Sequence, residues 1–115
     1  MDAILRDEIN RMHARVCSGL ADPNRILILY TLAEKPANVS DLAESLALPQ
    51  PTVSRHLKVL RERRMVFATR DGQAVIYTVA DMRVIEALNL LRMVMADSLE
   101  SQVELARTAT LAMEH

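Results

Sequence analysis

The chain has 115 residues, half of them apolar, and a formal net charge of −1. This length supports one hydrophobic core but not two, so we expect a single domain. No apolar run is long enough to span a bilayer, and charges interrupt the N-terminal stretch MDAILRDEINR where a secretory signal would be continuous. The single cysteine cannot form an internal disulfide, and these features together predict a cytoplasmic protein.

Helical spacing of apolar residues predicts two helices before residue 36. The first extends to about Gly19, and its apolar residues are Ile4, Leu5, Ile9, Met12 and Val16. The second begins at Asp22 and Pro23, because aspartate is a favoured N-cap and proline suits the first helical turn. Pro36 ends it, and its predicted buried residues are Ile26, Leu27, Leu29, Tyr30 and Ala33.

A short third helix is predicted in NVSDLAESLAL, with Ser40 or Asn38 as its N-cap. Its inward residues are Leu42, Ala43 and Leu46. The tight connection PQP then leads into a fourth helix, which ends in a cluster of arginines.

The fourth helix has two distinct sides on a helical wheel. One side is a narrow apolar seam of Val53, Leu57 and Leu60. The opposite side is polar and basic, with Thr52 and His56 on its flanks; its members are Ser54, Arg55, Lys58 and Arg61.

Positive charge is concentrated in this helix and the segment that follows it. Residues 50–73 carry six cations and two acids, a net charge of +4, and the rest of the chain carries eight cations and thirteen acids, a net charge of −5. A basic segment in an acidic chain indicates a surface for an anionic partner, although a solvated helix can also be basic. Arg55 suits a guanine edge, while Lys58 and Arg61 suit phosphates, so we interpret the helix as a DNA-binding element.

The segment MVFATRDGQAVIYTVA changes from helical to strand character. Two β-rich runs, Met65 to Thr69 and Ala74 to Val79, predict a β-hairpin with Asp-Gly at its tip. Asp81 then caps a long helical pattern from Met82 to beyond Leu99. The predicted fold is therefore mainly α with one hairpin, in the order α-α-α-α-β-β-α.

Four motifs of the chain, LADPNR, VSDLAESL, QPTVSRHLKVLRE and TRDGQAVIY, resemble the ArsR/SmtB family of bacterial winged helix-turn-helix repressors. The resemblance covers roughly residues 16 to 98. It implies one winged-helix DNA-binding domain over residues 1–115, with a helix-turn-helix at 39–64 and a wing at 65–79. It also implies a homodimer formed by helices at 1–19 and 81–105.

The resemblance assigns DNA-facing residues as well. On the fourth helix these are Gln50, Thr52, Ser54, Arg55 and His56, and on the wing they are Arg70 and Gln73. His56 could instead be a helix-surface histidine that packs on the hairpin, but its place two residues after Ser54 in the matching motif favours DNA. The fourth helices of such a dimer enter successive major grooves of operator DNA about 34 Å apart. Apolar residues on several sides of the last helix support a partner helix, although they also suit an ordinary core; they are Val84, Ile85, Leu88, Leu91, Met95 and Leu99.

The metal-binding patterns of the family are incomplete in this chain. The third helix has no cysteine pair, and Arg83 and Val94 stand where the zinc and cobalt sensors have histidines. Asp81 and Asp97 without imidazole form a poor zinc site. We therefore expect no metal cofactor. Two alternatives stay open for regulation: the protein responds to a small organic ligand, or it has no effector and responds to its own concentration.

His13 and Cys17 are a weaker candidate pair for a metal. Their i, i+4 spacing can hold one ion, and Cys17 alone can act as a redox-active thiol. Free cysteines are commonly buried, however, and Cys17 follows Val16 in an apolar stretch. We therefore expect an inert, buried Cys17.

Other functional classes fit less well. With two glycines the chain has no P-loop or dinucleotide-binding loop, and its three histidines lack a triad-like setting, so we do not expect an enzyme. The alternatives are a winged-helix protein-interaction module, a thiol- or metal-responsive repressor that uses Cys17, and a MarR-like regulator. The basic, hydroxyl-rich front of the fourth helix favours DNA over a protein partner.

Overall fold

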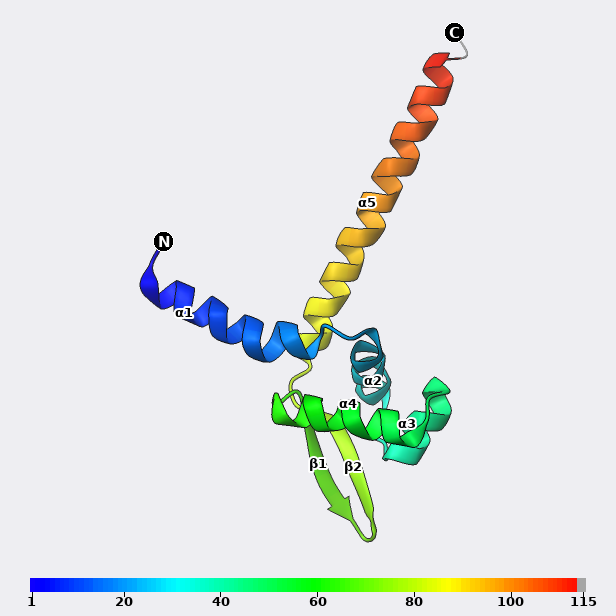
Figure 1. Cartoon of the computed structure of the whole chain (residues 1–115). Helices are drawn as coiled ribbons and strands as arrows, with labels where there is room; N and C mark the ends of the chain where they lie inside the picture. The colour runs from blue at the N-terminus through cyan, green and yellow to red at the C-terminus, as the bar shows by residue number, and fades with distance from the viewer. Residues whose placement is uncertain (114–115) are drawn as a thin grey trace. The chain divides into compact units, whose positions relative to one another are not determined.

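The computed structural model describes residues 1–113 and divides the chain into a unit of residues 1–82 and a second unit that begins at Arg83 (Figure 1). The first unit contains all elements except the last helix. Its elements in chain order are α1 (Ala3–Met12), the π-helical turn η1 (His13–Cys17), α2 (Pro23–Glu34), α3 (Val39–Leu46), α4 (Gln50–Glu62), β1 (Val66–Asp71) and β2 (Ala74–Val79). The second unit is the helix α5 (Arg83–Met113).

Local capping explains where the helices of the first unit begin. The Asp22 side chain accepts a hydrogen bond of 2.8 Å from the Asn24 amide, and Pro23 follows at the first helical position, which confirms the predicted start of α2. Asn38, and not Ser40, caps α3, since its side chain accepts a hydrogen bond of 2.8 Å from the Asp41 amide. α3 ends at Ala47, which has a left-handed backbone with φ 54°.

The core of the first unit lies between α2, α3, α4 and the start of β1. Its largest fully buried side chains are Ile28, Leu29, Leu42, Val53, Leu57, Leu60 and Val66. The predicted seam of α4 is confirmed. In α2 the prediction was partly wrong, because Leu27 is 50% exposed while Ile28 and Leu32 are buried. Apolar residues occupy several sides of α2, so periodicity alone did not define its buried side.

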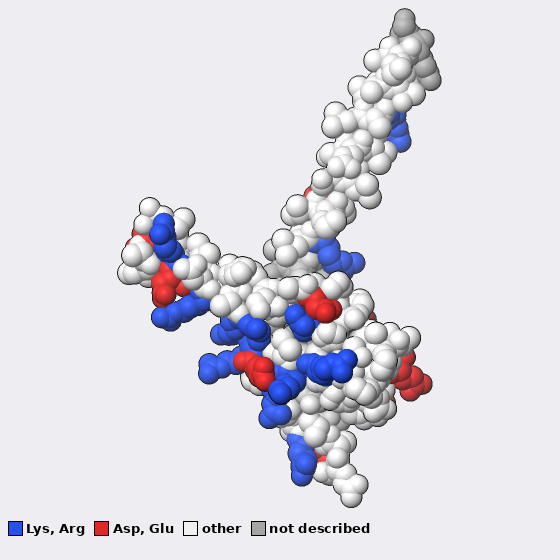
Figure 2. Space-filling model, viewed as in Figure 1, with Lys and Arg blue, Asp and Glu red and all other residues white. Residues whose placement is uncertain are grey.

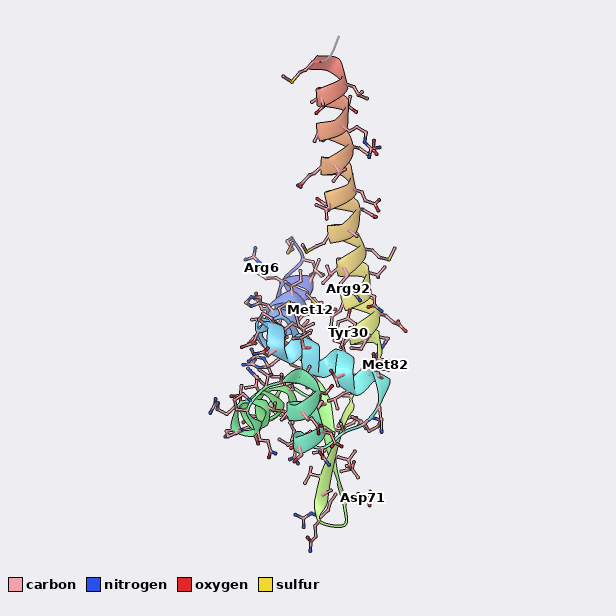
Figure 3. The ribbon with its side chains drawn as sticks, turned by 90° about the vertical axis from the view of Figure 1, so that its right-hand side faces the viewer. Arg6, Met12, Tyr30, Asp71, Met82 and Arg92 are labelled. Carbon is pink, nitrogen blue, oxygen red and sulfur yellow. The ribbon has the colours of Figure 1, made fainter. Side chains whose placement is uncertain are left out.

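The hairpin pairs β1 with β2 in an antiparallel register from Val66 opposite Val79 to Asp71 opposite Ala74. The tip is therefore Gly72-Gln73, and the predicted Asp-Gly tip is corrected by one residue. Of the two loop residues only Gly72 has a positive φ, 64°, as expected for a two-residue loop that starts with glycine. Figure 3 shows Asp71 close to the tip.

A short bridge attaches the hairpin to the helix-turn-helix. The Tyr77 amide donates to the Ala37 carbonyl at 2.9 Å, and the Ala37 amide donates to the Tyr77 carbonyl at 3.2 Å. The segment between α2 and α3 thereby forms a one-residue antiparallel bridge with β2. The hairpin is consequently held to the body of the unit by backbone hydrogen bonds as well as by side chains.

The two terminal helices have large apolar side chains that the chain itself does not cover. Every residue from 1 to 15 is exposed, including Ile4, Leu5, Ile9 and Met12 of α1. Every residue from 89 to 113 in α5 is exposed too, and its large apolar members are Leu90, Leu91, Met93, Val94, Met95, Leu99, Val103, Leu105, Leu111 and Met113. None of the helices formed by residues 1–113 combines the length and apolar character needed to cross a bilayer.

Candidate nucleic-acid interface

The polar side of α4 is exposed along the whole helix. Outside the buried seam, the exposed polar and basic residues are Gln50, Ser54, Arg55, Lys58 and Arg61, with Thr52 half-buried among them and the acid Glu62 exposed at the end of the helix. The six residues other than Glu62 lie among those that the sequence predicted for DNA contact. We call these six residues the α4 front.

Two hydrogen bonds order the N-terminal half of the α4 front. The Gln50 side-chain amide donates to the Ser40 hydroxyl of α3 at 3.2 Å. One turn later, the Arg55 guanidinium donates to the Thr52 hydroxyl at 3.3 Å. Both contacts lie at the surface, so they hold polar groups in place there without burying them.

The C-terminal end of α4 is joined to the end of the first helical segment by two arginines. Arg15 donates from Nε to the Arg63 carbonyl at 3.1 Å, and the Arg63 guanidinium donates in return to the Ala14 carbonyl. Arg64, the residue after Arg63, has a left-handed backbone with φ 59°, so the chain cannot continue as a helix beyond this point. Sequence reasoning assigned no role to Arg15 and Arg63, because their partners lie 48 and 49 residues away.

The wing presents its two predicted residues to solvent. Arg70 is exposed near the end of β1, opposite Val75, and Gln73 is exposed in the two-residue loop. Figure 2 shows Lys and Arg side chains gathered over α4 and the adjoining part of α1, with a further basic group on the wing. Basic side chains of α4 and of the wing therefore occur on the same face of the unit.

His56 differs from the other predicted contact residues. Its side chain is only 14% exposed and is directed toward the beginning of α2. The Arg25 guanidinium donates to Nδ1 of His56 at 3.4 Å, and Nε2 of His56 lies 3.9 Å from the Asp22 carboxylate. His56 is thus engaged within the protein and is not part of the α4 front.

The candidate sensing residues lie on η1. His13 and Cys17 are both exposed, so the prediction of a buried Cys17 was wrong. The neighbouring Val16 is half-buried, so an apolar neighbour in the sequence did not indicate that Cys17 itself is exposed. Within residues 1–113, no three His, Cys, Asp or Glu side chains are grouped closely enough to hold a metal ion.

A helix-turn-helix with an exposed basic front, followed by a hairpin wing, defines a winged helix-turn-helix protein of the DNA-binding class. A family model described as "Bacterial regulatory protein, arsR family" matches residues 22–67. The transcriptional repressor SmtB homolog of Synechocystis sp. is 38% identical over 94 residues, which cover 82% of this chain and 67% of that protein. The chain belongs to the ArsR/SmtB family of transcriptional regulators, and these relatives are regulators rather than enzymes.

Two further comparisons agree with this assignment. The HTH-type transcriptional regulator NmtR of Mycobacterium tuberculosis is 37% identical over 76 residues, 66% of this chain and 63% of NmtR. The structure of the homodimeric winged helix-turn-helix DNA-binding domain Mb0332 from Mycobacterium bovis superposes with a TM-score of 0.74 at 27% identity, covering 87% of this chain and 92% of that one. The matched part is 45% to 63% of the length of several Mycobacterium tuberculosis relatives.

Proposed function

We propose that this protein is a homodimeric transcriptional repressor that binds operator DNA in the cytoplasm. The observation that carries the proposal is the α4 front, a largely solvent-exposed polar and basic surface on a helix whose apolar seam is fully buried. A helix with this division is attached to the core on one side and can enter a major groove with the other.

The roles of the contact residues follow from their chemistry. Arg55 reads a guanine edge, because its guanidinium can donate two parallel hydrogen bonds to O6 and N7. Gln50, Thr52 and Ser54 contribute shorter polar contacts to bases or phosphates near the N-terminus of α4. Lys58 and Arg61 neutralise phosphates, and Arg70 and Gln73 of the wing contact the adjacent backbone.

The homodimer is supported by the exposed apolar residues of both terminal helices. An amphipathic helix in a globular protein normally buries its apolar stripe, yet the apolar side chains of α1 and of α5 beyond Leu88 are exposed in the single chain. We therefore assign dimerisation to residues 1–19 and 81–105. Two recognition helices related by a two-fold axis would bind half-sites about 34 Å apart.

The experiment that tests the proposal is a titration of the purified protein against duplex DNA from its own promoter, with an unrelated duplex as the control. We expect preferential, strongly salt-dependent binding to the promoter, since phosphate neutralisation releases counterions. Absence of binding to either duplex at any salt concentration would contradict the proposal and favour the protein-interaction module.

The same titration addresses the effector. It is repeated with zinc, cadmium, copper(I), arsenite and an oxidant, for the wild-type protein and for Cys17→Ser. If none of these additions changes the affinity for promoter DNA, the protein is a repressor that does not respond to these metals or to thiol oxidation. Release by one addition, lost in Cys17→Ser, would identify the alternative in which the exposed Cys17 thiol is the sensing group.

A further inference from the structure

The Arg25 side chain connects three separate parts of the first unit. Its Nε donates to the Gly19 carbonyl at 2.8 Å, and Nη2 donates to the Ser18 carbonyl at 3.2 Å. Its third nitrogen, Nη1, donates to Nδ1 of His56 at 3.4 Å. One half-buried guanidinium therefore joins the segment after η1, the first turn of α2 and the middle of α4.

His56 is the acceptor in this contact. A guanidinium has donors only, so in a hydrogen bond with Arg25 the Nδ1 atom of His56 accepts. The other ring nitrogen, Nε2, lies 3.9 Å from Oδ2 of Asp22. The other oxygen of the same carboxylate caps α2 through the Asn24 amide. His56 is consequently held between a cation and a carboxylate that both belong to the start of α2.

Other polar contacts of α4 with the body of the unit lie at its two ends, from Gln50 to Ser40 and between Arg63 and residues 14–15, and its middle is held mainly by apolar contacts. Val53, Leu57 and Leu60 are buried in the core, and burial of apolar surface is not directional. A seam of this kind keeps the helix on the core but defines its rotation about its own axis less sharply than a polar contact does. The hydrogen bond from Arg25 to His56 is such a polar contact in the middle of the helix.

We infer that Arg25 and His56 are positioning residues for DNA recognition, an inference that rests on the proposed function. Between the polar contacts at the two ends of α4, they fix the rotation of its middle turn, and therefore the direction in which the neighbouring Ser54 and Arg55 leave the helix. Base-edge contacts demand well-defined geometry, whereas contacts to phosphates tolerate small rotations. Loss of the contact should thus lower binding to the operator more than binding to unrelated DNA.

The test compares His56→Leu, Arg25→Gln and His56→Gln by measuring the affinity of each folded variant for promoter DNA and for an unrelated duplex. We expect His56→Leu and Arg25→Gln to weaken promoter binding roughly tenfold, because a misdirected Arg55 loses part of its base contact, and to leave binding to unrelated DNA unchanged. His56→Gln keeps an acceptor for Arg25 and should restore most of the specificity. Arg25→Gln also removes the hydrogen bonds to the Gly19 and Ser18 carbonyls, so it is the more severe single change. The combined variant should be no weaker than Arg25→Gln alone, since His56→Leu removes a contact that Arg25→Gln has already removed.

Lys58→Gln is the matched control on the same helix, because the exposed Lys58 should contact phosphate and its loss should weaken binding to both duplexes. An equal loss for both duplexes in His56→Leu, or no loss, would overturn the inference. A changed base preference at one operator position in His56→Gln would also overturn it, since His56 would then read DNA directly. Failure of the wild-type protein to prefer its promoter would instead contradict the proposed function itself.

Discussion

Gly19 lies directly against the buried side chain of Met65: a Cβ atom added at Gly19 would be 2.6 Å from the Met65 sulfur. The two residues bring the segment before α2 into close contact with the segment between α4 and β1. Gly19 is also an acceptor for Arg25, so the same small residue takes part in packing and in the polar link to α2. A side chain at this position has no room unless Met65 moves.

Substitution of Gly19 by alanine should therefore destabilise the protein. We expect Gly19→Ala to lower the free energy of unfolding by about 1–3 kcal/mol, the usual cost of overpacking a core. The measurement is urea denaturation followed by circular dichroism. The double variant Gly19→Ala with Met65→Ala should lose less stability than the sum of the two single variants, because Met65→Ala removes the side chain that the new Cβ would meet. A loss equal to the sum would show that Met65 does not obstruct a side chain at position 19.

Gly72 should be sensitive for a different reason. A Cβ at Gly72 would meet nothing within 4 Å, but the residue has a φ of 64° in the two-residue loop. Gly72→Ala should cost about 1–2 kcal/mol through backbone strain alone. Thermal unfolding would detect the cost, and Gln73→Ala in the same loop is the control, since Gln73 has no positive φ and should tolerate the change.

The end of α3 offers a stabilising change. Ala47 is exposed and left-handed, with φ 54°, a conformation that favours glycine at the end of a helix. Ala47→Gly should raise the free energy of unfolding by about 0.5–1 kcal/mol, since the relief of strain exceeds the entropy lost by glycine. The same urea titration measures it. A decrease in stability would mean that Ala47 is not strained.

Two residues of the α4 front should affect DNA binding in different ways. Arg55→Ala should cost about 1–3 kcal/mol of binding free energy and alter the sequence preference, as expected for a residue that reads a base. Lys58→Ala should weaken binding to all sequences and reduce the salt dependence by about one phosphate contact. Mobility-shift titrations at several salt concentrations separate the two effects. Unchanged affinity in both variants would contradict the assignment of α4.

Charges introduced on the terminal helices should separate the dimer without unfolding the chain. Ile9 and Leu91 are exposed in the single chain, so Ile9→Glu and Leu91→Glu should have little effect on the folding of the protomer. If both helices form the dimer, each substitution buries a charge in the interface and shifts the protein to monomers in sedimentation experiments. Asn89→Glu on α5 is a polar control. A wild-type protein that sediments as a monomer would contradict the proposed homodimer.

Much of the fold follows from short-range signals. The start of α2 depends on Asp22 and Pro23, and the buried seam of α4 depends on the spacing of Val53, Leu57 and Leu60. Each of these signals acts within a few residues, so sequence alone predicted the order of helices and the hairpin. The tip of the hairpin was misplaced by one residue, because the choice between Asp-Gly and Gly-Gln depends on the pairing of the two strands.

The features that the sequence did not determine depend on contacts between distant residues. Arg25 and His56 are 31 residues apart, and only the packing of α2 on α4 brings the guanidinium to the imidazole. The exposure of Leu27 and Cys17 likewise depends on which neighbours cover them, and no local pattern encodes that. Sequence by itself determined the helices, the hairpin and the basic front of α4, because hydrophobic spacing and charge are local properties. The tertiary structure alone decided that His56 is held inside the protein while Arg55, its neighbour in the chain, is exposed.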